Sequence, residues 1–227
     1  MEKRYERNVK ALSVEESERL KGFKVCVIGC GGLGGHVIEQ LGRLGVGNIT
    51  AVDGDVFEES NLNRQLFSDE TVLGKSKAEQ AKIRMSSVNS GVCVAVVNEF
   101  LDESNCESIL KGHDIVVDAL DNKATRIIVE RAAQKLLIPV VHGAIAGWFG
   151  QVCVIMPGRP LYGLIYPEAR AKGPESELGN LPFTAAVAAS IEAAEAVKVL
   201  LGKENTLAGK FLTFDLLNND FEVFSFF

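Results

Sequence analysis

Residues 25–35 of the chain are V-C-V-I-G-C-G-G-L-G-G. A short hydrophobic run ends at Gly29, and a helical repeat of apolar residues follows at Leu33, Val37, Ile38, Leu41 and Leu44. Gly29, Gly31 and Gly34 match the pattern G-x-G-x-x-G, and Asp53 ends the next apolar run. Glycines let backbone N–H groups approach phosphate oxygens, the helix N-terminus adds a positive dipole, and the acid bonds ribose hydroxyls. The stretch predicts a nucleotide-binding turn, but it does not choose between ATP and NAD.

Apolar segments alternate with amphipathic ones on both sides of this turn. Strands are predicted at residues 23–28, 48–52, 92–97, 115–119 and 139–144, and helices at 33–44, 75–88, 105–111 and 123–137. A short capped helix is predicted before the first strand. Such alternation is typical of an α/β fold with a Rossmann-like, mostly parallel sheet and helices on both faces.

The pattern changes after residue 145. One more strand is predicted at 148–156, and residues 157–182, which hold five of the six prolines, are predicted to form a long loop. A loop of that length is usually a lid or a binding loop, and a disordered insertion is the alternative. A helix at 183–201 and two strands at 210–216 and 221–226 follow, so we expect C-terminal antiparallel strands to extend the sheet.

Composition excludes several classes of function. The 227 residues are 47% hydrophobic with a formal charge of −6, which argues against a general nucleic-acid binder. The charged N-terminus lacks a signal core and no run has the length of a membrane span, so we expect a cytoplasmic protein. Because Cys26, Cys93 and Cys153 lie in strand-like runs, we expect them to be buried reduced thiols.

Hydrogen-bond donors are concentrated just beyond the second predicted strand. They are Asn61, Arg64, Gln65, Lys75 and Lys77. Ligands of open α/β sheets bind at the carboxyl ends of the strands, so this cluster indicates a bound polyanion. A guanidinium clamps two phosphoryl oxygens and an ammonium acts as a point charge, which suits Arg64 and Lys77 to a triphosphate. A solvated helix face is the alternative interpretation.

A second polar group follows the fourth predicted strand, near the same crevice. It comprises Asp118, Asp121, Asn122 and Arg126. A carboxylate that faces a triphosphate needs a cation between them, which makes Asp121 the candidate Mg²⁺ ligand. Asp118 is equally well explained as a structural carboxylate. The three histidines, His36, His113 and His142, lie outside these motifs and are predicted to be structural.

Taken in order, five motifs resemble one family. They are G-C-G-G-L-G, D-G-D, S-N-L-N-R-Q, G-K-S-K-A and D-A-L-D-N-K-A-T-R. The set is similar to the ubiquitin-activating-enzyme superfamily, and more narrowly to the ThiF/MoeB/HesA-type adenylyltransferases, over nearly the whole chain. The resemblance implies a single ThiF-like adenylation domain over residues 1–227. It would comprise an N-terminal helical arm (1–22), a nucleotide-binding core (23–146), and a crossover loop, helix and strands for carrier binding (147–227).

The resemblance also implies roles for individual residues. Gly29, Gly31, Gly32 and Gly34 would cradle the phosphates, Asp53 would hold the ribose, and Asp55 would also contact the nucleotide. The residues around the triphosphate would be Asn61, Arg64, Gln65 and Lys77, with Asp121 on Mg²⁺ and Asn122 beside it. Arg64, Lys77 and Asp121 would be catalytic. Arg7, in R-Y-E-R-N, would reach into the partner subunit's site of a homodimer.

The reaction implied is adenylation. The C-terminal glycine carboxylate of a small ubiquitin-like sulfur carrier ending in Gly-Gly would attack the α-phosphorus of Mg-ATP and release pyrophosphate. No general base is needed, since that carboxylate is already ionised at pH 7. Sequence alone leaves the pathway open between thiamine, molybdopterin and other sulfur transfer.

The chain departs from the family in its cysteines. Many bacterial relatives carry two zinc-binding C-x-x-C pairs, but here residues 161–164 are L-Y-G-L and the C-terminal part has no cysteine, so no zinc is expected. Residues 157–182 also lack a cysteine, so we expect the adenylate to pass to an external sulfur donor or a downstream enzyme. The alternatives are adenylation of a small carboxylate or a tRNA base, an NAD-dependent oxidoreductase, and a non-catalytic partner subunit.

Overall fold

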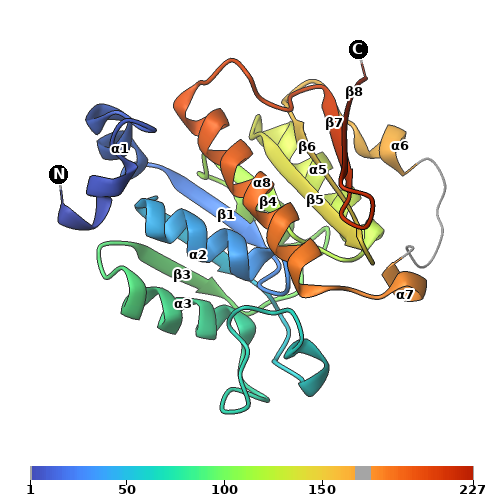
Figure 1. Cartoon of the computed structure of the whole chain (residues 1–227), viewed down its shortest axis with the longest axis horizontal. Helices are drawn as coiled ribbons and strands as arrows, with labels where there is room; N and C mark the ends of the chain where they lie inside the picture. The colour runs from blue at the N-terminus through green and yellow to red at the C-terminus, as the bar shows by residue number, and fades with distance from the viewer. Residues whose placement is uncertain (1, 167–174, 227) are drawn as a thin grey trace.

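The computed structural model describes residues 2–166 and 175–226, and they form one eight-stranded sheet (Figure 1). Its strands are β1 (Lys24–Ile28), β2 (Asn48–Val52), β3 (Cys93–Val97), β4 (Ile115–Asp118), β5 (Val140–Ala146), β6 (Phe149–Ile155), β7 (Lys210–Asp215) and β8 (Asp220–Ser225). The spatial order is β3-β2-β1-β4-β5-β6-β7-β8. The first five strands in that order pair in parallel and the last three are antiparallel. The predicted Rossmann-like fold, with its antiparallel extension, is confirmed.

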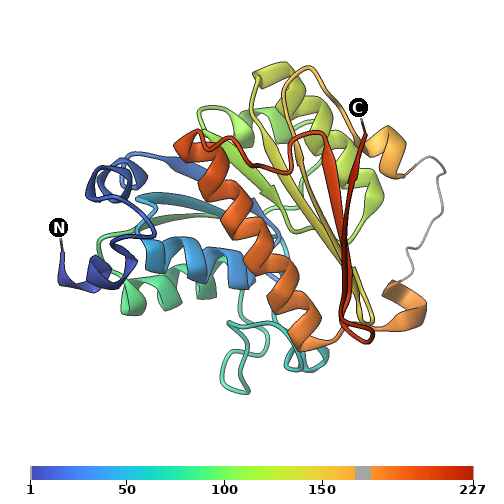
Figure 2. The ribbon, with the colours of Figure 1, turned by 45° about the horizontal axis from the view of Figure 1, so that its top comes forward.

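Helices cover both faces of this sheet. They are η1 (Lys3–Asn8), α1 (Val14–Leu20), α2 (Gly34–Leu44), η2 (Glu59–Asn61), α3 (Lys77–Val88), α4 (Cys106–Leu110), α5 (Lys123–Leu136), α6 (Tyr162–Ile165), α7 (Glu175–Leu178) and α8 (Pro182–Leu201). One core joins the sheet to α2, α3 and α8, and a second joins it to α4, α5 and α6. Figure 2 shows α8 running beside α2 across the sheet. Because β1 alternates between the two cores, it is apolar at every buried position.

Most predicted boundaries are correct to within one residue, but the strand predicted at 139–144 continues to Ala146 and two other segments need correction. The helix predicted at 75–88 begins at Lys77, because the Ser76 side chain accepts the Glu79 N–H and so caps the helix. The long loop predicted at 157–182 is interrupted by α6 and α7, and α8 begins one residue early because proline fits the first helical position. The rest of that loop prediction, residues 167–174, lies outside the described residues.

The prediction for the cysteines was wrong for Cys93. Cys26 and Cys153 are buried, as are Cys30 and Cys106, but Cys93 is exposed. It begins β3, the outermost strand of the parallel half, where side chains alternate between the covered face and solvent. None of the helices in the described part of the chain has the length and apolarity needed to cross a bilayer.

Candidate functional site

The glycine turn (residues 29–34) is closed so tightly that side chains are excluded at two positions. A Cβ on Gly34 would lie 1.7 Å from the carbonyl oxygen of Gly29. Gly29 itself has φ +90°, and a Cβ there would lie 2.7 Å from the carbonyl oxygen of Ala119. The turn leads directly into α2, and the residue at its N-cap position, Leu33, provides no side-chain cap. The Gly35 N–H donates to the Gly31 carbonyl at 3.0 Å, and the N–H of Gly34, at the same helix start, is the one that an anion can approach.

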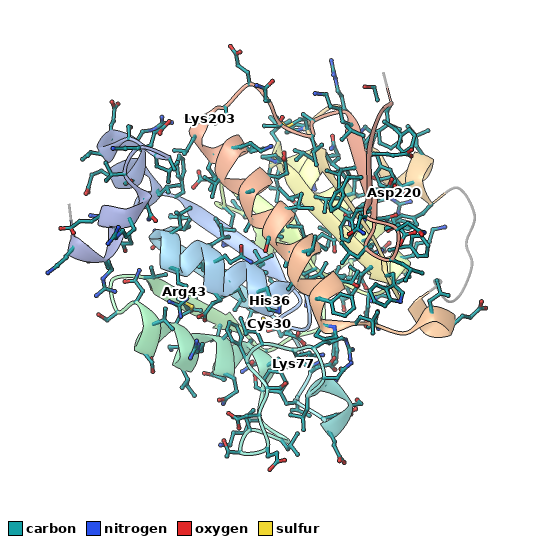
Figure 3. The ribbon with its side chains drawn as sticks, viewed as in Figure 1. Cys30, His36, Arg43, Lys77, Lys203 and Asp220 are labelled. Atoms are coloured by element: carbon teal, nitrogen blue, oxygen red, sulfur yellow. The ribbon has the colours of Figure 1, made fainter. Side chains whose placement is uncertain are left out.

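Asp53 joins the end of β2 to the glycine turn. Its carboxylate accepts the Cys30 N–H at 2.7 Å and the Asp55 N–H at 2.8 Å. Burial raises the pKa of Asp53 above its ordinary value, although both of these hydrogen bonds act against the rise. The exposed Asp55 carboxylate lies 3.1 Å from Nζ of Lys77, a buried side chain at the first position of α3. Figure 3 labels Cys30 and Lys77 in the same region of the molecule.

The segment that follows η2 covers the glycine turn from outside. The side-chain amide of Gln65 lies beside Gly31, 3.4 Å from the position of an added Cβ, and the stem of Arg64 lies 3.5 Å from that of Gly32. Arg64 Nη1 donates to the Ser60 carbonyl (3.1 Å) and to Asn63 Oδ1 (2.8 Å).

The other side chains of this segment have different surroundings. Asn61 is buried and accepts the Glu58 N–H at 3.0 Å, so in this structure it holds the turn. Lys75 is exposed, whereas Lys77 is buried. The donor cluster predicted beyond the second strand is therefore not uniform. Arg64 and Gln65 contact the glycine turn, Asn61 and Lys77 are buried, and Lys75 is exposed.

The β4–α5 turn (residues 119–122) brings the second predicted group to the same place. β4 lies next to β1 in the sheet, so the Ala119 carbonyl contacts the glycine turn at Gly29. Asp121 is exposed on this turn, and Asn122 caps α5 by accepting the Thr125 N–H at 2.8 Å. The structure therefore brings Gln65 and Arg64 from the first predicted group, and the turn that carries Asp121 and Asn122 from the second, to the same glycine turn.

Arg7 is not part of this cluster. It is exposed on η1, where the neighbouring Tyr5 packs against Gly45 at the C-terminal end of α2. The glycine turn precedes the other end of that eleven-residue helix. Arg7 therefore lies away from the site of its own chain.

Two residues of the predicted second group, Asp118 and Arg126, are buried behind the β4–α5 turn together with His142 and Tyr162, a cluster that was not predicted. Asp118 accepts hydrogen bonds from His142 Nδ1 (3.0 Å) and the Tyr162 hydroxyl, and Arg126 Nε lies 3.7 Å away. Burial raises the pKa of Asp118, but its contacts with His142 and Arg126 outweigh burial and leave that pKa below its ordinary value. Burial lowers the pKa of His142, so the ring is neutral and donates through Nδ1. Fully buried, Asp118 is a structural carboxylate.

Glu192, on the other face of the sheet, was also missed. It is fully buried on α8, and a Cβ on Gly143 would lie 2.4 Å from its carboxyl carbon. Within residues 2–166 and 175–226, neither oxygen of this carboxyl has a hydrogen-bond partner. Burial, with the nearby charge of Asp118, raises the pKa of Glu192 well above its ordinary value of 4.5. Burial therefore favours the protonated, neutral form of Glu192.

Glu192→Gln should stabilise the protein increasingly as pH rises. Because the pKa of Glu192 is higher in the folded protein than in the unfolded chain, protonation of this carboxyl stabilises the fold. That stabilisation is fully present below the unfolded pKa, near 4.5, and is lost as the pH rises through the folded pKa. The side-chain amide of the variant does not titrate. Between the unfolded and the folded pKa of Glu192, the free energy of unfolding of the variant should therefore rise relative to the wild type by at most about 1.4 kcal/mol per pH unit. Urea unfolding at pH 5, 7 and 9 measures the gain. Glu195→Gln is the control, because that carboxylate accepts the Leu207 N–H at 2.7 Å. A pH-independent difference for Glu192→Gln would contradict the assignment.

Comparison with known proteins agrees with this geometry. The model of the ThiF family matches residues 5–226. The SAMP-activating enzyme E1 of Haloferax volcanii is 37% identical over 227 residues, covering 96% of this chain and 83% of the relative. The sulfur carrier protein adenylyltransferase of Thermus thermophilus is 39% identical over 216 residues, covering 91% and 80%. These names favour adenylation over the oxidoreductase alternative.

A solved structure supports the fold. Escherichia coli MccB superposes with a TM-score of 0.86 and 22% identity, covering all of this chain and 72% of MccB. The family model and the two relatives thus agree on the family, and the solved structure shares the fold. The chain, from residue 5 to residue 226, belongs to the ThiF family.

Proposed function

We propose that this protein is an ATP-dependent adenylyltransferase that activates the C-terminal glycine carboxylate of a small ubiquitin-like sulfur-carrier protein as an acyl-adenylate, with release of pyrophosphate. One observation carries the proposal: the closed glycine turn, the buried Lys77 and the turn with the exposed Asp121 all lie at the carboxyl ends of the parallel strands. The names of the Haloferax and Thermus relatives supply the class of substrate.

ATP fits the residues at this edge. Gly29, Gly31, Gly32 and Gly34 leave room for phosphates at the uncapped start of α2. Lys77 would exchange its ion pair with Asp55 for one with the triphosphate, and Arg64 would turn from Ser60 towards it. The buried Gln65 Oε1 has no hydrogen-bond partner among the described residues, so its amide can reorganise around a ligand. Asp53 would hold the ribose, with Asp55, Asn61 and Asn122 around the nucleotide.

Catalysis of this reaction requires positive charge near the phosphates and correct positioning of the two substrates, and it requires no proton transfer. The carrier's terminal carboxylate is ionised at pH 7 and attacks the α-phosphorus directly. Negative charge then grows on the departing pyrophosphate. Once the nucleotide is bound, Lys77 and Arg64 would place positive charge beside the departing pyrophosphate, which lowers the barrier.

Mg²⁺ fits the donors that the β4–α5 turn offers. Asp121 presents an exposed carboxylate beside the glycine turn, and Mg²⁺ prefers one or two carboxylates together with phosphate oxygens. When bound, the ion would neutralise charge on the phosphates. We assign this role to Asp121.

Carrier binding is assigned to residues 147–227, as part of a single adenylation domain over residues 1–227. Large apolar side chains are exposed there: Trp148, Phe149, Phe183, Phe221, Val223 and Phe224. The rings of Trp148 and Phe183 pack 4.8 Å apart at the start of α8. Amide hydrogen exchange should show carrier-dependent protection within residues 147–166 and 175–226, and protection confined to the rest of the chain would refute the docking assignment.

The experiment for the function is ATP–pyrophosphate exchange with a candidate carrier. Exchange should require Mg²⁺ and a carrier ending in Gly-Gly, and a carrier that lacks its last glycine should support none. Exchange at equal rates with both carriers would reject the proposal.

We place Arg7 in the site of a partner subunit, because it lies at the far end of α2 from its own glycine turn. Arg7→Ala and Lys77→Ala homodimers should both exchange pyrophosphate far more slowly than the wild type. Mixing the two subunits should restore a fraction of exchange activity, since a hybrid dimer contains one site with both residues intact. Size-exclusion chromatography of the mixture checks that hybrids form. Hybrids without activity would contradict a role in trans.

A further inference from the structure

The β4–α5 turn exposes Asp121, yet buried groups hold the residues on either side of it. Ala119 N–H donates to the Ile28 carbonyl at 2.9 Å, which ties the turn to β1. Leu120 N–H donates to Asp118 Oδ1 at 3.0 Å, and the Leu120 carbonyl accepts from Arg126 Nη2. The Leu120 peptide, which precedes Asp121, is therefore held by the Asp118 carboxylate and the Arg126 guanidinium. Asn122, which follows Asp121, caps α5.

The carboxylate and the guanidinium are themselves held by α6. The Tyr162 hydroxyl donates to Asp118, and the Tyr162 ring is fully buried. The Tyr166 hydroxyl accepts from Arg126 Nη1 at 2.6 Å and lies 3.0 Å from Nε2 of His142. Since His142 donates to Asp118 through Nδ1, its Nε2 accepts, and Tyr166 supplies the proton.

The start of α6 is anchored separately. The buried carboxylate of Glu130, on α5, accepts the N–H groups of Leu161 (2.7 Å) and Tyr162 (2.9 Å). Arg126 and Glu130 lie one turn apart on α5, so a single helix contacts both ends of α6 and also the β4–α5 turn. The short helix and the turn are thus parts of one hydrogen-bonded unit.

We infer that Tyr162 and Arg126 are positioning residues for the metal site, because through Asp118 and the Leu120 peptide they hold the turn that directs Asp121 towards the nucleotide. The inference rests on the role proposed for Asp121. Neither residue touches the nucleotide in this arrangement. Their effect is on where the exposed carboxylate lies, so losing them should weaken Mg²⁺ binding more than ATP binding.

Tyr162→Phe tests this with the loss of one oxygen atom. The measurement is the Mg²⁺ concentration that gives half of the rise in melting temperature produced by a saturating non-hydrolysable ATP analogue, without any carrier. The concentration should increase on the order of 10-fold relative to the wild type. A merely structural role would lower the melting temperature of the unliganded protein and leave this concentration unchanged. An unchanged Mg²⁺ requirement would overturn the inference.

Tyr5→Phe is the matched control. It removes a buried hydroxyl that accepts from Asn89 at 2.8 Å, at the far end of α2 from the glycine turn. Its Mg²⁺ requirement should equal that of the wild type, and an equal shift in both variants would also overturn the inference. A wild type that binds Mg-ATP but catalyses no carrier-dependent exchange would instead reject the proposed function alone. A wild type that binds no Mg-ATP would reject both.

Discussion

Lys77→Ala should slow carrier-dependent ATP–pyrophosphate exchange by roughly 10²–10³, the usual cost of losing one transition-state donor. Lys77 is buried with its ammonium 3.1 Å from Asp55, so its position is set before the nucleotide arrives. A fixed charge acts where charge develops, without paying for reorganisation, and water cannot replace it at a buried position. The rate of exchange, measured at saturating carrier and ATP, reports the loss.

Lys75→Ala is the control for that variant. Lys75 carries the same charge two residues earlier in the chain, but its side chain is exposed. It should keep an exchange rate within a small factor of the wild type, since an exposed charge is screened. Thermal unfolding of both variants shows whether the Lys77 variant is folded. Undiminished exchange in folded Lys77→Ala would remove this residue from the catalytic set.

Gly34→Ala should abolish nucleotide binding and destabilise the fold. The new methyl group would lie 1.7 Å from the Gly29 carbonyl oxygen and 3.3 Å from the Ala119 side chain, so the turn must open. Overpacking of this kind costs about 1–3 kcal/mol, and here the atom in the way is backbone, which cannot rotate aside. Urea unfolding measures the destabilisation, and the ATP-induced rise in melting temperature should disappear.

Gly35→Ala separates this steric effect from helix propensity. The two glycines are adjacent in the first turn of α2, but a Cβ on Gly35 would meet its nearest atoms at 3.6 Å, an ordinary contact. Alanine is favoured over glycine in a helix by about 0.5–1 kcal/mol, so Gly35→Ala should be neutral or stabilising and should still bind ATP. If the two variants behaved alike, the closed turn would not be the reason for Gly34.

The sequence predicted the parallel half of the fold and the meeting of two distant motifs. The helical repeat of apolar residues identified α2, and the short continuous apolar runs on either side of it identified β1 and β2 as buried strands. Because parallel strands end at the same edge, the segments after Asp53 and Asp118 had to lie near the glycine turn. The structure bears this out in the contacts of Gln65 with Gly31 and of Ala119 with Gly29.

The hydrogen-bond partners of individual side chains could not be predicted from the sequence. Nothing in L-Y-G-L shows that the Tyr162 hydroxyl bonds Asp118, since their contact depends on how α6 packs against the sheet. An acidic residue in an Ala-rich apolar helix is unusual, so the sequence could have marked Glu192 as a candidate for burial. Its contact with Gly143, however, depends on how α8 packs against the sheet. The exposure of Cys93 follows from the position of β3 at the sheet edge, which strand order alone decides.

The central claim is that this chain joins AMP to the C-terminus of a carrier protein. Intact-mass spectrometry of a Gly-Gly-ended carrier, incubated with Mg-ATP and catalytic amounts of the protein under acidic quench, tests it most directly. We expect a carrier species heavier by one adenylyl group, which should form far more slowly with Lys77→Ala and should be absent when the terminal glycine is removed. A carrier of unchanged mass, in the presence of wild-type protein that demonstrably binds Mg-ATP, would contradict it.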